Sequence, residues 1–128
     1  MTRNEFLKKT KRFVLFCASG WRALPEKTPS AGYAGPCLED GFEIKPSLFG
    51  ADVYYNGAKM FTVNRKGKTL MEAADGSANL DAVIKNAGLE ETASDAAMFF
   101  VCLGMAGYLK NRVEIEIYEN KDEAEFGE

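Results

Sequence analysis

The sequence predicts a single α+β domain, and three observations support this fold class. The chain has 128 residues, which is enough for one hydrophobic core without metal or disulfide staples. Its hydrophobic fraction of 46% and charged fraction of 27% are typical of globular proteins. Short alternating stretches occur beside stretches with helical spacing. We therefore expect an N-terminal helix, an antiparallel sheet of four to five short strands and two later helices over residues 1–119, followed by an acidic tail at 120–128.

The N-terminal residues favour a helix, with one alternative. Apolar residues from Phe6 to Cys17 recur at helical spacing, which predicts an amphipathic helix over residues 2–17. The apolar run at 13–18 is too short for periodicity to assign it, so it remains open as a short buried strand.

The middle of the chain predicts strands. Residues 42–45 form a candidate strand before Pro46, and Asn56-Gly57 predicts a type I′ turn joining strands at 53–55 and 59–63. Residues 64–67 suit a type I turn, after which 69–73 would return as the third strand of a meander over 52–73.

The C-terminal half predicts two helices and a strand. One helix is capped by Ser77 or Asn79 and ends at Gly88. The next begins near residue 94, and its apolar body, 96–109, is hydrophobic all round, so we expect it to be deeply buried. Residues 113–117 then alternate between apolar and acidic side chains, as in a strand with one acidic face.

The composition excludes several classes of chemistry. The chain contains no histidine, which rules out Ser-His-Asp and Cys-His catalysis and histidine-containing metal sites within it. The three cysteines are widely spaced and form no C-x-x-C pair. This pattern indicates neither a zinc site nor a disulfide framework. We expect no metal and no cofactor, and the function is more consistent with binding than with catalysis.

Cys37 is the one candidate nucleophile. It lies in a Gly/Pro-rich loop at 24–41 that we expect to expose it, together with Tyr33. The neighbouring Glu39 and Asp40 would raise its pKa. Cys17 and Cys102 suit the core instead.

A basic and aromatic group of residues is the candidate ligand site. Cations beside aromatic rings suit single-stranded nucleic acid, although a net charge of −3 argues against such a ligand. Gly67-Lys68-Thr69 resembles the end of a P-loop, but Thr62 stands where that motif requires glycine. A solvated turn at the end of a hairpin is therefore the simpler interpretation. Gly104 and Gly107 indicate close packing on the last helix. The alternative ligand-binding residues are Tyr33, Cys37, Tyr54, Lys59, Arg65, Lys66 and Lys68, with Tyr55 beside them.

Charge is unevenly distributed along the chain. Residues 1–22 carry six basic side chains and one acidic one, whereas residues 112–128 carry two basic and seven acidic ones. We therefore expect a non-enzymatic protein-binding module, a small acidic regulator or inhibitor whose Glu114, Glu116 and Glu119 occupy a basic, nucleic-acid-binding type of surface on a target protein. The alternative hypothesis is a small enzyme or a ligand- or nucleic-acid-binding domain built on the loop and hairpin.

Location and assembly follow from the same composition. The apolar run at 13–18 is shorter than a signal peptide requires, and the longest uncharged apolar stretch, 96–109, is shorter than the ~20 residues that cross a bilayer. We expect a cytoplasmic protein with no membrane partner. Exposed strand edges would also suit a homodimer.

Overall fold

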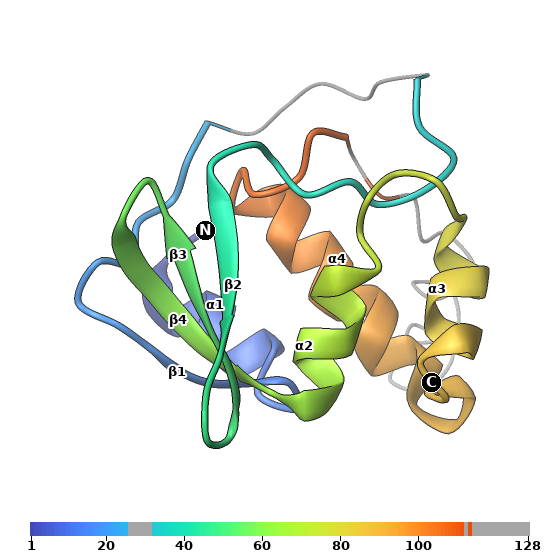
Figure 1. Ribbon diagram of the computed structural model, residues 1–128, viewed down its shortest axis with the longest axis horizontal. Coiled ribbons are helices and arrows are strands. Elements are labelled where there is room, and N and C mark those ends of the chain that lie inside the picture. The colour runs from blue at the N-terminus through green and yellow to red at the C-terminus, as the bar shows by residue number, and fades with distance from the viewer. Residues whose placement is uncertain (26–31, 112, 114–128) are drawn as a thin grey trace, which may run out of the picture.

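The computed structural model describes residues 1–25, 32–111 and 113 of the chain. In these residues it shows four α-helices and one four-stranded antiparallel sheet, which confirms the α+β prediction. The strands are β1 (Val14–Cys17), β2 (Phe42–Pro46), β3 (Gly50–Tyr55) and β4 (Ala58–Asn64), and the helices are α1 (Arg3–Lys9), α2 (Arg65–Glu72), α3 (Leu80–Asn86) and α4 (Ala93–Met105), with a short 3-10 helix, η1 (Glu90–Thr92), before α4. The strand order is β1-β4-β3-β2. Figure 1 shows the sheet on the left, α2 and α4 beside it, and α3 on the side away from the sheet.

The N-terminal residues form a helix followed by a strand, so the expectation of one helix over residues 2–17 is wrong. In α1, the Thr2 hydroxyl accepts a hydrogen bond from the Glu5 N–H, and the Glu5 carboxylate accepts one from the Thr2 N–H. The helix ends at Lys9 and is capped by Thr10, whose hydroxyl donates back to the Phe6 carbonyl at 2.6 Å. The chain then pairs with β4 as β1. The alternative of a short strand within 13–18 is confirmed. The apolar run is too short for its own periodicity to determine its secondary structure, and pairing with β4 determines it instead.

One of the two hairpins of the sheet follows the predicted turn chemistry, and the other, between β2 and β3, was not predicted. Asn56 has φ 48° and Gly57 has φ 87°, both positive as a type I′ turn between β3 and β4 requires. Between β2 and β3, the Ser47 N–H donates to the Gly50 carbonyl at 3.1 Å. A Cβ on Gly50 would lie only 2.3 Å from the Val63 carbonyl oxygen, so this position needs glycine. The predicted strands at 42–45, 53–55 and 59–63 are confirmed.

The prediction of a third meander strand at 69–73 is wrong, because this segment belongs to α2. Asn64, expected to open a type I turn, instead caps the helix: its Oδ1 accepts a hydrogen bond from the Gly67 N–H at 2.9 Å. Gly67, Leu70 and Met71 are buried at helical spacing. Asn suits both the first position of a turn and a helix N-cap, and packing of this face decides between them.

The two later helices agree with the prediction. Asn79 caps α3 by accepting from the Ala82 N–H at 2.8 Å, and Gly88 follows it with φ 70°. Seven of the thirteen residues of α4 are buried, from Ala96 to Gly104, so this helix runs through the core as expected. It ends at Met105 and not at residue 109 as expected, because Gly107 takes φ 85° just after its C-terminus and Leu109 pairs with Leu38.

The core centres on aromatic side chains that join both layers. The Phe6 ring from α1 lies 5.3 Å from that of Phe61 on β4 and 5.9 Å from that of Tyr108 after α4. A second contact joins Phe13, just before β1, to Phe99 on α4, with 5.5 Å between the ring centroids. All five side chains are at most 1% exposed. The sheet and α4 therefore share one core, to which α1 is attached mainly by Phe6, its one buried residue.

The described parts of the 24–41 loop contain no helix or strand, as expected, but they are held to the core. The Leu24 N–H donates to the Ala106 carbonyl at 2.7 Å, and Leu38 pairs with Leu109 in an isolated bridge. The predicted strand at 113–117, apart from Val113, and the tail at 120–128 lie outside the described residues.

Candidate interaction surfaces

The outer face of the sheet holds part of the predicted basic and aromatic group. Lys59 lies 3.3 Å from the Asp52 carboxylate and 5.2 Å from the Phe16 ring centroid, measured from its Nζ. Lys45 places its Nζ 4.4 Å from the Tyr54 ring centroid. Both lysines therefore already have an aromatic neighbour and a carboxylate, because the Lys45 Nζ also lies 3.9 Å from the Glu43 carboxylate, and these contacts lower their availability for phosphate.

The structure does not bring the rest of that group to the same face. The Tyr55 ring instead lies 4.8 Å from the Phe42 ring and 5.5 Å from the Arg22 guanidinium. The solvated turn expected at 64–68 is instead the start of a helix, and its cations Arg65, Lys66 and Lys68 lie on α2. The two clusters, one on the sheet and one on α2, do not form the single binding hairpin that the sequence indicated.

Gly67 is required by packing and does not form part of a phosphate loop. A Cβ at this position would lie 2.9 Å from the Val63 Cβ and 3.1 Å from the Phe13 carbonyl oxygen. Its N–H is already used in the Asn64 cap. β4 also runs directly into α2, without the Gly-rich turn that cradles phosphates.

Cys37 is buried, so the expectation of an exposed thiol is wrong. The residue is 7% exposed. The Cys37 N–H donates a hydrogen bond to the Asn111 side-chain oxygen, and the Cys37 carbonyl accepts one from the Lys110 N–H. Burial raises the pKa of the Cys37 thiol; Lys110 opposes this rise, whereas the nearby carboxylates add to it. A protonated, buried thiol is a poor nucleophile at neutral pH.

The other predicted residues in and around the loop are also structural. Tyr33 is 36% exposed and packs on the turn after α2, where a Cβ on Gly76 would lie 2.7 Å from the Tyr33 ring. Cys17 and Cys102 are buried, as expected of core residues, and burial raises the pKa of Cys102 to about 11. Glu114, Glu116 and Glu119 lie outside the described residues.

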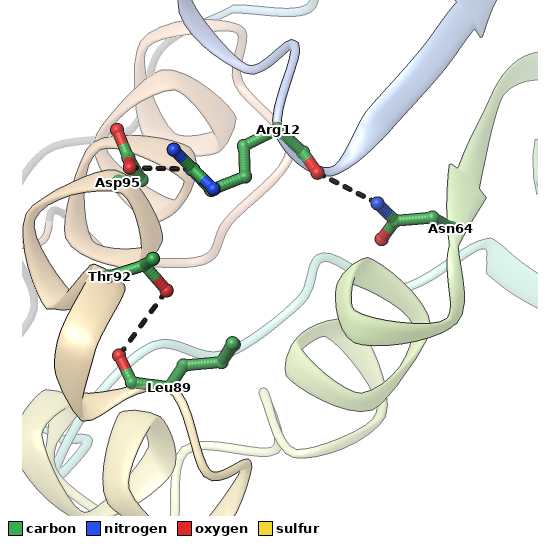
Figure 2. Close-up of polar contacts among 5 residues, drawn as sticks. All are labelled: Arg12, Asn64, Leu89, Thr92 and Asp95. Carbon is green, nitrogen blue, oxygen red and sulfur yellow. Dashed lines mark hydrogen bonds and ion pairs between the residues drawn. The ribbon is translucent and has the colours of Figure 1, made fainter.

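A polar junction connects the turn before β1 to α4 and to the end of β4. Arg12 Nε lies 2.6 Å from Asp95 Oδ2, and the Asn64 amide donates to the Arg12 carbonyl at 2.7 Å (Figure 2). The Thr92 hydroxyl donates to the Leu89 carbonyl at 3.5 Å beside it. Because the Arg12 and Asp95 side chains are about half exposed, solvent weakens their ion pair. These contacts hold the elements in place.

The turn between β2 and β3 carries an apolar pair that the sequence analysis missed. Leu48 is 84% exposed and Phe49 is 64% exposed, which makes them the two most exposed large hydrophobic side chains of the described residues. We call this pair the hairpin tip. A signal was present in the sequence, since two large apolar residues stand between Pro46-Ser47 and Gly50, where polar turn residues are usual.

Two basic side chains lie at the same end of the sheet as the hairpin tip. Gly50, next to the tip, pairs with Asn64, after which the exposed Arg65 and Lys66 begin α2. Leu15 and Phe16 are also exposed, at 43% and 45%, but they lie on β1, at the opposite end of the strand order from β2. Exposed apolar groups with a charged rim are typical of contact surfaces.

Neither a metal-binding cluster nor a membrane-spanning helix occurs in the part of the chain that the structure covers. Within residues 1–25, 32–111 and 113, no three Cys, Asp or Glu side chains come together as a possible metal site. None of the helices in these ranges combines the length and the apolar character needed to span a bilayer.

Comparison with known proteins adds no assignment. The chain matches no protein-family model, no curated protein and no solved structure.

Proposed function

We propose that this chain is a non-enzymatic protein-binding module that contacts its partner through the hairpin tip. The observation that carries the proposal is the exposure of Leu48 and Phe49, 84% and 64%, at the end of a hairpin. Leaving two large apolar side chains in water forgoes about 1.5–3 kcal/mol each, relative to burying them. A partner that covers them would recover part of this free energy.

The chemistry of the tip indicates the kind of surface that it fits. A convex apolar pair fits a concave apolar pocket, and Arg65 and Lys66 at the same end of the sheet favour carboxylates around that pocket. This contact differs from the acidic contact expected of Glu114, Glu116 and Glu119, which remains a prediction for residues outside the described ranges. The buried, protonated Cys37 gives the alternative enzymatic hypothesis no nucleophile.

The test is a capture experiment with the paired substitution Leu48→Asp and Phe49→Asp. We expect the variant to recover about tenfold less partner from a native lysate than the wild type, because anchor residues at the centre of an interface dominate its affinity. Both side chains are exposed, so the variant should keep the wild-type circular dichroism spectrum and melting temperature.

Met105→Asp is the matched control. Met105 is also a large exposed apolar residue, 42% accessible, but it lies at the end of α4. We expect its variant to recover partner as the wild type does. Equal recovery by the tip variant and the wild type would remove the hairpin tip from the proposal.

A further inference from the structure

The edge of β2 that faces away from β3 has no partner strand among residues 1–25, 32–111 and 113, and we call it the free edge. β2 lies at one end of the strand order, and within the described residues only β3 pairs with it. The bonds from the Ser47 N–H to the Gly50 carbonyl and from the Asn56 N–H to the Gly41 carbonyl fix which residues face β3. By strict alternation, Glu43 and Lys45 bond β3 through their backbones, whereas the backbones of Phe42 and Ile44 point to the free edge.

We propose that this edge binds β2 of a second copy of the chain, with the two strands antiparallel and the two-fold axis at Ile44. The Ile44 residues would then exchange N–H to carbonyl hydrogen bonds, and the Phe42 N–H of each copy would donate to the Pro46 carbonyl of the other. The two sheets join into one. The interaction is isologous, so it closes at a dimer.

Charge selects this alignment over its neighbours. On the outer face, Glu43 and Lys45 are exposed, with accessible side-chain fractions of 65% and 56%. With the axis at Ile44, Glu43 of each copy stands directly opposite Lys45 of the other, in pairs whose Cβ atoms lie about 4.5–5.5 Å apart. An axis at Glu43 or at Lys45 would instead place like charges opposite each other, which is unfavourable.

The edge also has the features that limit further association. Pro46 has no N–H, so pairing cannot extend past it by the same pattern. A pair of five-residue strands buries less than the ~1,200 Å² at the lower end of stable interfaces, so we expect a reversible dimer that dissociates on dilution. The hairpin tip lies beyond the paired residues, which makes this surface separate from the one in the proposed function.

The test uses charge reversal at two exposed positions, measured by sedimentation velocity across a concentration series. Glu43→Lys and Lys45→Glu each place two like-charged pairs across the axis, so we expect each variant alone to dimerise about tenfold more weakly than the wild type. An equimolar mixture of the two variants can form a heterodimer in which opposite charges face each other again, and we expect this heterodimer to regain the wild-type affinity. The double variant Glu43→Lys/Lys45→Glu should also regain it.

Several outcomes would overturn the proposal. A wild type that stays monomeric at every concentration would leave the edge to water or to another partner. Single variants that dimerise like the wild type, or a mixture that stays monomeric, would place any dimer elsewhere. The Leu48→Asp/Phe49→Asp variant should dimerise normally, so a failure of the hairpin tip and a failure of the β2 edge are distinguished.

Discussion

Phe6→Ala is expected to lower the free energy of unfolding by about 3–5 kcal/mol, the cost of truncating a buried phenylalanine. Phe6 is fully buried and contacts the rings of Trp21, Phe61 and Tyr108. It is also the one buried residue of α1, so its loss removes the main attachment of that helix. Urea unfolding followed by circular dichroism measures the change.

Phe16→Ala provides the control for this substitution. Phe16 is 45% exposed on the outer face of the sheet, where truncation leaves no cavity. We expect it to cost about 1 kcal/mol or less. If Phe6→Ala cost no more than Phe16→Ala, α1 would not be attached to the core in the way described.

Gly107→Ala is expected to destabilise the fold by about 2–4 kcal/mol, for two reasons. Gly107 has φ 85°, a conformation that costs a residue with a Cβ about 1 kcal/mol or more. A Cβ there would also lie 2.4 Å from the carbonyl oxygen of Leu24, which is backbone and cannot rotate away. Relieving that overlap would displace the segment whose Leu24 N–H donates to the Ala106 carbonyl. Chemical denaturation measures the loss.

Gly104→Ala, only three residues earlier, should behave in the opposite way. Gly104 lies inside α4, and a Cβ there would meet the Leu109 side chain and the Asn111 carbonyl only at 3.9 and 4.0 Å. Alanine fits this space, and replacing glycine inside a helix stabilises it by up to about 1 kcal/mol. Destabilisation of the two variants by equal amounts would contradict the packing described at the end of α4.

Local chemistry was sufficient to predict several elements. Asn56-Gly57 specifies its turn because both residues must take positive φ, and Asn79 and Gly88 mark the two ends of α3 by capping. The apolar character of α4 on all sides predicted its burial. In these elements, the residues that determine the conformation lie within a few positions of each other.

Other elements depend on contacts between distant residues. Residues 13–18 become β1 because β4 is available to pair with them, and residues 65–72 become α2 because Gly67 packs on Val63 and Phe13. Asn64 carries a signal that suits both a turn and a helix. No short window of sequence contains the partner that resolves such a choice.

The candidate sites were harder to predict than the fold. Cys37 was expected to be exposed because Gly and Pro surround it, yet its backbone is tied to Asn111 and Lys110, more than seventy residues away. The hairpin tip was missed because its exposure depends on where β2 and β3 end. Composition identified the loop and the turn, but only the tertiary arrangement shows which side chains reach solvent.

Amide hydrogen exchange of β2 tests most directly whether the chain associates through the edge of this hairpin. At low concentration, we expect the Glu43 and Lys45 amides to be protected by β3 while those of Phe42 and Ile44 exchange rapidly. At high concentration, Phe42 and Ile44 should gain protection and the other two should change little. Protection of all four amides that does not depend on concentration, or Phe42 and Ile44 amides that stay unprotected throughout, would contradict association through this edge.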